Sequence, residues 1–127
     1  KQIGAEHIQI ITDIKKKHSS HAVSADVSIA GTAKAAEFFL SDGVIVTGAA
    51  TGEKASVDEV KEVKQAVKVP VIIGSGIDAG NIHDYLDFAD AFIVGSSLKI
   101  DGNWENPVDP ERVRNLMLKV NQLKKSV

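Results

Sequence analysis

The chain has 127 residues, of which 43% are apolar and 25% are charged, which is the composition of one soluble globular domain. This balance excludes a disordered or collagen-like protein, and no apolar run approaches the ~20 residues needed to cross a bilayer. A net charge of −2 excludes the basic surface of a nucleic-acid-binding protein, and the absence of cysteine excludes disulfides and thiolate metal sites.

Four short runs rich in isoleucine and valine predict buried strands, at 8–12, 44–47, 71–73 and 92–94. The segments after them carry apolar residues at helical spacing, around 29–40, 60–67, 82–86 and 113–120. A continuous apolar strand needs cover on both faces, which is typical of the parallel sheets of α/β proteins. The sequence therefore predicts a single α/β domain, residues 1–127, built from four consecutive βα units.

Two helix starts are marked by capping residues. Ser56 and Glu59 have the capping-box spacing, in which each side chain accepts a hydrogen bond from the other residue's backbone amide. Asp109 precedes Pro110, and a proline at the first helical position loses nothing because the amide there has no acceptor. The pair Asp42-Gly43 is expected to close the first helix just before the second strand.

Two sequences rich in glycine and serine follow the third and fourth predicted strands. They are Gly74, Ser75 and Gly76, and then Gly95, Ser96 and Ser97. Glycines let backbone amides approach an anion closely, and the loops after strands seven and eight of (β/α)8 barrels commonly bind phosphate. The pair predicts a phosphate-binding site, with two tight turns as the alternative. A dinucleotide site is disfavoured, because Gly74, Gly76 and Gly80 lack the G-x-G-x-x-G spacing.

Asp13, at the end of the first predicted strand, is the candidate catalytic residue. In a strand, Gln9, Ile11 and Asp13 share one face, and we expect this less apolar face to point into a barrel. The carboxylate would then lie at the mouth where barrel enzymes carry their reacting groups, as a general base or a contact for a ligand hydroxyl. Lys17 and His18 are candidates to pair with a phosphate or to carry a proton. A loop cap or salt bridge for Asp13, and a solvent-exposed loop for Lys17 and His18, are the alternatives.

Three candidate ligand contacts follow the second predicted strand, namely Thr47, Gly48 and Thr51. An ordinary capped loop is the alternative for them. His18 and His21 with Asp13 could imitate a metal triad, but a serine-rich loop fixes no geometry, so no metal site is predicted. Trp104 is expected to plug the end of the barrel, with stacking on a ligand as the alternative.

Five strings of the sequence resemble the BtpA family of (β/α)8 barrels, known for a photosystem I biogenesis factor and for relatives in sugar-utilisation gene clusters. They are DIKKKH at 13–18, VIVTGAATG at 44–52, VIIGSG at 71–76, AFIVGSSLK at 91–99 and DGNWENPVDPERV at 101–113. The last two strings are the most specific. The resemblance covers nearly the whole chain and implies a barrel of the ribulose-phosphate-binding type. It also implies that the chain holds the C-terminal four βα units, with strands five to eight.

The resemblance implies no particular reaction or cofactor, so two functions stay open. One is an enzyme that binds or acts on a phosphorylated sugar or nucleotide-like molecule, with Asp13 and either Lys17 or His18 transferring protons. The other is a non-catalytic assembly or biogenesis factor that retains a relic phosphate site. Because a half barrel has two open sheet edges, we expect a homodimer or another association that completes the barrel. We also expect a cytoplasmic location.

Overall fold

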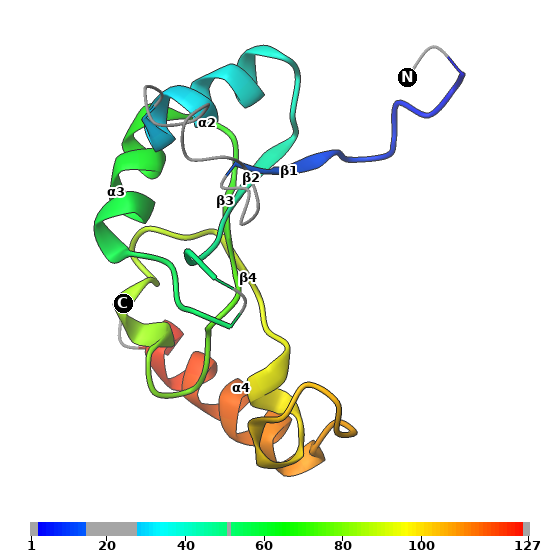
Figure 1. The fold of residues 1–127 in the computed structure, drawn as a ribbon, viewed down its shortest axis with the longest axis vertical. Helices are drawn as coiled ribbons and strands as arrows, with labels where there is room; N and C mark the ends of the chain where they lie inside the picture. The colour runs from blue at the N-terminus through cyan, green and yellow to red at the C-terminus, as the bar shows by residue number, and fades with distance from the viewer. Residues whose placement is uncertain (1–2, 15–27, 51, 126–127) are drawn as a thin grey trace.

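The computed structural model describes residues 3–14, 28–50 and 52–125 (Figure 1). Its strands are β1 (Ile11–Asp13), β2 (Gly43–Val46), β3 (Val71–Gly74) and β4 (Ala91–Ile93), and its α-helices are α2 (Ile29–Phe38), α3 (Val57–Ala66) and α4 (Pro110–Lys125). Three 3-10 turns complete the order, namely η1 (Ile82–Asp84), η2 (Ser96–Leu98) and η3 (Ile100–Gly102). The four strands form one parallel sheet in the order β1-β2-β3-β4. The predicted α/β fold of consecutive parallel βα units is confirmed, and this order is that of four neighbouring strands in a (β/α)8 barrel.

The core lies between the sheet and the helices that cover one of its faces (Figure 1). Val44, Val46, Val71 and Ile73 point into this core and are fully buried, because alternate residues of a strand face the same side. Val60 and Val63 of α3 pack against them. The outward side of the sheet is therefore the helix-covered side, as in a barrel.

The opposite face of the sheet has no helix over it in the described part of the chain. The strand register places five residues on this face, namely Ile11 and Asp13 of β1, Ile45 of β2, Ile72 of β3 and Ala91 of β4. Ile11 is 43% exposed, although an isoleucine in a sheet is normally buried. In a closed barrel this face would be the interior.

Both predicted capping residues act at the helix starts. The Ser56 hydroxyl accepts a hydrogen bond from the Glu59 amide at 3.5 Å, and α3 begins at the next residue. The Asp109 carboxylate accepts one from the Glu111 amide at 3.0 Å, and Pro110 is the first residue of α4. These two helix starts are confirmed.

The end of α2 differs from the prediction, because Leu40 and not Asp42-Gly43 closes the helix. Leu40 has a φ of 67°, its amide donates to the Glu37 carbonyl, and the Ser41 amide donates to the Ala36 carbonyl. This pair of hydrogen bonds is the Schellman motif, whose left-handed position is usually glycine. The helix therefore stops at Phe38, several residues before β2.

The helix predicted around 82–86 is wrong, because only the 3-10 turn η1 forms there. The Asp78 carboxylate accepts hydrogen bonds from the Gly80 and Asn81 amides, and such local bonds compete with a helix. Tyr85 then turns into the core, where it is 1% exposed and its hydroxyl donates to the Ala55 carbonyl at 2.6 Å. Burial raises the pKa of this phenol, and the charge of Asp84 raises it further.

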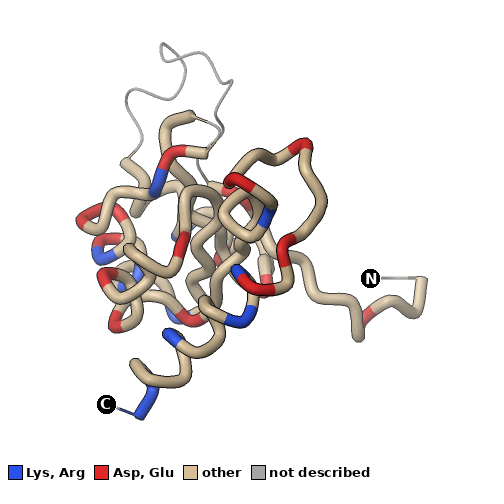
Figure 2. Tube along the Cα trace, turned by 90° about the horizontal axis from the view of Figure 1, so that it is seen from below, with Lys and Arg blue, Asp and Glu red and all other residues tan. Residues whose placement is uncertain are grey.

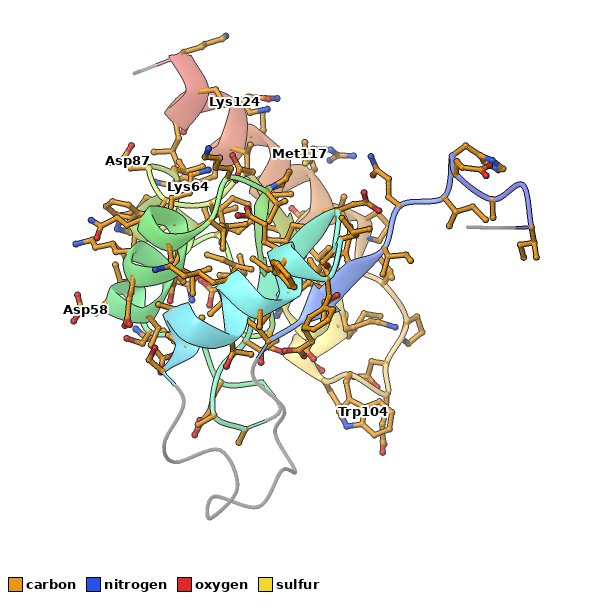
Figure 3. All side chains as sticks on the ribbon, turned by 90° about the horizontal axis from the view of Figure 1, so that it is seen from above. Asp58, Lys64, Asp87, Trp104, Met117 and Lys124 are labelled. Atoms are coloured by element: carbon orange, nitrogen blue, oxygen red, sulfur yellow. The ribbon has the colours of Figure 1, made fainter. Side chains whose placement is uncertain are left out.

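Two other expectations change at the edges of the molecule. The first strand is Ile11–Asp13 and not 8–12, because the Ile10 amide donates to the Asp42 carboxylate instead of to a neighbouring strand. Trp104 is 71% exposed and lies at the periphery (Figure 3), so it does not pack into the described part of the fold, and its role at the end of a closed barrel stays a prediction.

Candidate functional site

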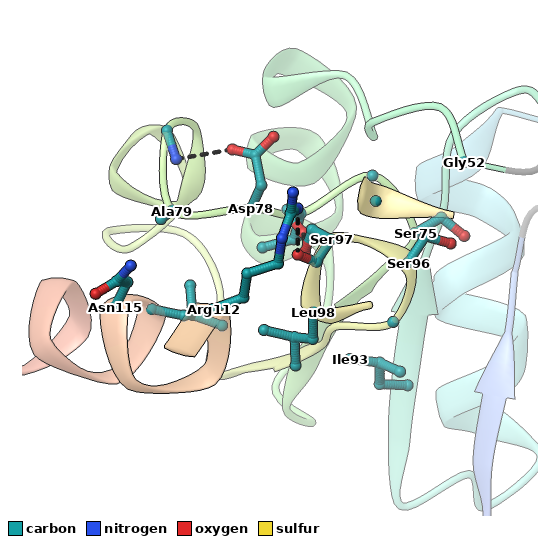
Figure 4. A pocket seen from close by; sticks show the side chains of 16 residues that line it. Gly52, Ser75, Asp78, Ala79, Ile93, Ser96, Ser97, Leu98, Arg112 and Asn115 are labelled. Atoms are coloured by element: carbon teal, nitrogen blue, oxygen red, sulfur yellow. Dashed lines mark hydrogen bonds between the residues drawn. The ribbon is translucent and has the colours of Figure 1, made fainter. Parts of the chain in front are cut away.

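The two Gly-Ser loops meet because β3 and β4 are parallel neighbours whose carboxyl ends lie at one edge of the sheet. Gly74, the last residue of β3, is in register with Ile93 of β4. The Ser97 hydroxyl donates to the Ile77 carbonyl at 2.7 Å and joins the loops directly. Both loops line one cavity of about 830 Å³, a volume within the range of small-molecule sites (Figure 4).

The cavity lining is mostly glycine, serine and apolar side chains. Besides the two loops, it includes Gly52 from the loop after β2, and Arg112 and Asn115 from α4. Asp78 and Arg112 are the ionisable side chains among the described lining residues. The site can therefore offer backbone amides, hydroxyl groups and one cation to a ligand.

The first loop has an unusual backbone. Ser75 has a φ of 76° and Gly76 a φ of 68°, a backbone conformation that residues other than glycine rarely adopt. Such residues gather at ligand-binding sites, where the surrounding structure holds them in place. Here the support is close packing, because a Cβ added at Gly76 would lie 2.4 Å from the Lys54 backbone.

A network of side-chain hydrogen bonds fixes the rest of this loop. The Asn81 side-chain amide donates to the Gly76 carbonyl at 2.7 Å, and its oxygen accepts from the Asp78 amide at 3.0 Å. The Asp78 carboxylate accepts from the Gly80 and Asn81 amides at 2.8 and 2.9 Å. Gly76 to Asn81 is therefore held in shape before any ligand arrives.

The second loop passes into η2. The Leu98 amide donates to the Gly95 carbonyl and the Lys99 amide to the Ser96 carbonyl, which closes a tight turn. The first amides of such a turn have no acceptor within it. Because the Ser97 hydroxyl donates to Ile77, the donors that this loop could offer to a ligand are its backbone amides and the Ser96 hydroxyl.

Arg112 joins the site from the first turn of α4, although no functional role was predicted for it from the sequence. Its Nη1 donates to the Ser97 carbonyl at 3.2 Å, and its Nε lies 3.7 Å from the Asp109 carboxylate. Figure 4 shows the side chain reaching from the helix toward Ser97 and Asp78. The helix start at Asp109-Pro110 was the available signal, since it fixes which residues form the first turn.

The described candidate residues on β1 and directly after β2 lie outside the lining of this cavity. Asp13 is exposed and in register with Ile45. Thr47 is 5% exposed, and a Cβ added at Gly74 would lie 3.5 Å from its methyl group, so the two share a face. Gly48 has a packing reason to be glycine, because a Cβ there would lie 2.2 Å from the Glu53 carbonyl oxygen.

The remaining candidates, Lys17, His18 and Thr51, lie outside the described residues, as does His21. Among residues 3–14, 28–50 and 52–125, no group of three His, Asp or Glu side chains could hold a metal ion. Within the same ranges, no helix is long and apolar enough to span a membrane. Acidic and basic residues are interspersed along the described chain (Figure 2).

The sequence pattern of the BtpA family matches residues 1–122. Relatives include a protein of Caenorhabditis elegans, named as uncharacterized and mitochondrial, that is 51% identical over 95% of this chain and 43% of its own length. An uncharacterized protein of Methanocaldococcus jannaschii is 33% identical over 98% of this chain and 46% of its own. The cytoplasmic location stays a prediction.

A third relative is the photosystem I biogenesis protein BtpA of Synechocystis, which is 36% identical over 84% of this chain and 37% of its own length. The chain thus spans less than half the length of these relatives. Among solved structures, the YdjI aldolase of Escherichia coli K12 is similar, with a TM-score of 0.49 and 20% identity over 98% of this chain and 48% of the aldolase.

Proposed function

Because the chain belongs to the BtpA family, we propose that it binds or acts on a phosphorylated sugar or nucleotide-like molecule between its two Gly-Ser loops. One observation carries the proposal. Loops from two neighbouring strands line a single cavity of about 830 Å³ and are tied together by the Ser97 hydroxyl. Two turns that bind nothing would have no need of a left-handed Ser75 beside this cavity.

The lining matches the chemistry of a phosphate group. Phosphate oxygens accept hydrogen bonds, and the loops offer them backbone amides at glycines, where no side chain blocks the approach. Ser75 and Ser96 add hydroxyl groups, and Arg112 adds positive charge. The cavity is larger than a phosphate ion, which leaves space for the sugar or nucleoside part of the ligand.

In the enzymatic form of the proposal, Asp13 transfers protons with Lys17 or His18. Asp13 lies on the face of the sheet that would form the barrel interior, two strands away from β3. Parallel strands lie about 4.8 Å apart, so this separation is about 10 Å. A ligand whose phosphate occupies the Gly-Ser loops would need a sugar-sized extension to reach the carboxylate.

Thermal melting with phosphorylated and neutral ligand pairs tests the proposal. We expect ribose 5-phosphate and adenosine monophosphate to raise the melting temperature, because a ligand that binds only the folded state stabilises it. Ribose and adenosine, which lack the phosphate, serve as controls. If inorganic phosphate, ribose 5-phosphate and the nucleotide all leave melting unchanged, the proposal is wrong.

A non-catalytic assembly factor is the second candidate, and the name of the Synechocystis relative favours it. Under this alternative the phosphate site is a relic, and surface contacts carry the function. The Asp13→Asn substitution separates the two, because it removes the proposed base while keeping the size of the side chain. Loss of biological activity in this variant supports the enzyme, and retained activity supports the assembly factor.

We further propose that a second copy of the chain closes the barrel. β1 and β4 each have one edge without a neighbouring strand in the described chain. A twofold axis along the barrel would place β4 of one copy beside β1 of the other with all strands parallel, which makes eight strands. Both open edges and the exposed apolar side chains of the uncovered face would then be buried.

A further inference from the structure

Arg112 is the positively charged side chain among the described residues that line the cavity. The other ionisable lining residue is Asp78, whose carboxylate already accepts two hydrogen bonds from the Gly80 and Asn81 amides. These amides hold Asp78 within its own loop. A negatively charged ligand in this cavity would therefore find its counter-charge on Arg112.

The guanidinium is positioned by contacts that use only part of its hydrogen-bonding capacity. Nη1 donates to the Ser97 carbonyl, and Nε lies near the Asp109 carboxylate. An arginine side chain carries five N–H donors in a planar fork, so these contacts orient it and leave further donors. The side chain is 41% exposed, so solvent and ligands can reach it.

We infer that Arg112 contacts the phosphate group and is the residue that makes this cavity select a phosphorylated ligand. The inference rests on the proposed function of the same cavity. Ser97 connects the two parts of the site, because its hydroxyl holds the first loop while its carbonyl holds the guanidinium. An anion at the Gly-Ser loops would thus meet amides from both loops and a guanidinium already aimed at them.

Calorimetric titration with ribose 5-phosphate at several salt concentrations tests this role. We expect Arg112→Gln to weaken binding tenfold to about hundredfold, the usual effect of losing a hydrogen bond to a charged group. It should also make the affinity less sensitive to salt, because the screened charge is gone. Arg114→Gln is the matched control, since Arg114 is exposed on the same helix and does not line the cavity.

Arg112→Lys separates charge from structural support, because lysine keeps the charge but cannot form the planar fork. We expect it to retain the salt sensitivity of the wild-type protein and to bind more weakly. If Arg112 only supports Ser97, both Arg112 variants will lose affinity with unchanged salt sensitivity, and the inference is wrong.

The wild-type protein distinguishes failure of this inference from failure of the proposed function. If wild type binds ribose 5-phosphate and Arg112→Gln binds it as tightly as Arg114→Gln, the role of Arg112 is refuted while the site stands. If wild type binds neither ribose 5-phosphate nor inorganic phosphate, the proposed function and the inference fail together. Should the glutamine variant melt below the assay temperature, Arg112→Met, which also removes the charge and keeps an aliphatic stem, is titrated in its place, and unchanged salt sensitivity in that variant refutes the role of Arg112.

Discussion

Gly76 combines a left-handed backbone with a lack of space for any side chain. Its φ is 68°, and a Cβ would lie 2.4 Å from the Lys54 amide nitrogen, a distance that real Cβ atoms do not tolerate. Gly95, in the other loop, has a negative φ and no heavy atom within 4 Å of an added Cβ. The two loop glycines therefore have different roles.

We predict that Gly76→Ala lowers stability by about 2 kcal/mol or more, because it adds a clash with backbone to a strained conformation. Gly95→Ala should change stability by less than about 0.5 kcal/mol and weaken the proposed phosphate binding instead, since its methyl group enters the cavity that Gly95 lines. Urea unfolding and ligand titration of both variants measure the two effects. Equal losses of stability in the two variants would contradict this division.

Leu40 occupies the position at the end of α2 where glycine is usual. A left-handed residue with a side chain costs about 1–2 kcal/mol, and Leu40 is 77% exposed, so few contacts compensate. The two hydrogen bonds of the Schellman motif hold it there. The sequence placed the helix end at Gly43 because it assigned the left-handed position to a glycine.

We predict that Leu40→Gly stabilises the chain by about 1 kcal/mol, the backbone cost less the entropy that glycine gains on unfolding. Leu40→Ala is the control, because it removes the same exposed side chain and keeps the backbone cost. Urea unfolding at one protein concentration gives both values. The backbone explanation fails if alanine stabilises as much as glycine.

Two carboxylates connect the helices to the loops and strands beside them. Glu37 of α2 accepts hydrogen bonds from the Lys68 and Val69 amides at 2.6 and 3.0 Å, and these bonds lower the pKa of its carboxyl group. For Asp90, burial raises the pKa, but hydrogen bonds from Lys64 and the Val71 amide outweigh burial, and the net pKa is lowered. The folded protein therefore stabilises the ionised form of both carboxyl groups.

The lowered pKa of Asp90 predicts how its contribution to the free energy of unfolding changes with pH. A lowered folded-state pKa contributes stability above the ordinary value of 3.8, and that contribution is lost as the pH falls through the folded value. Asp90→Asn should therefore be less stable than wild type at pH 7, and the difference should shrink below pH 3.8. Urea unfolding across this range measures it, with Asp87→Asn as an exposed control. A difference independent of pH would exclude the ionic explanation.

Local signals explain which elements could be predicted from the sequence. The strands appear as runs of β-branched residues, and the starts of α3 and α4 are encoded within four residues by Ser56 and Asp109. The segment at 82–86 had the right spacing for a helix, but its structure depends on the contact between Tyr85 and Ala55, thirty residues apart in sequence. Helical spacing alone does not contain that contact.

One part of the candidate site could also be predicted from the sequence, and another part could not. Neighbouring parallel strands end at the same edge, so the meeting of the two Gly-Ser loops followed from the order of the strands. Arg112 could not be assigned from its sequence context, because its contact with Ser97 depends on how α4 packs beside η2. Its charge alone did not distinguish it from the arginine two residues later.

The two open edges of the sheet, at β1 and β4, lead to a prediction about assembly. If the proposed closure holds, light scattering should give twice the chain mass of 13.5 kDa, because β1 and β4 each have one edge without a neighbouring strand in the described residues. Ile93→Asp should shift the protein to monomer, since Ile93 is 54% exposed on β4 at one open edge. Gln65→Asp, on the exposed surface of α3, should leave the mass unchanged. A stable wild-type monomer would contradict closure by a second copy.

The hydrogen bond between Ser97 and Ile77 has a consequence for grafting parts between related proteins. Each Gly-Ser loop belongs to a different βα unit, yet the Ser97 hydroxyl and the Ile77 carbonyl must meet at 2.7 Å. A chimaera that exchanges only one of the two units can lose this hydrogen bond, because its two partners then come from different proteins. A chimaera that exchanges both units together keeps the hydrogen bond. The smallest transferable piece of this fold is therefore the pair of units that ends in α4.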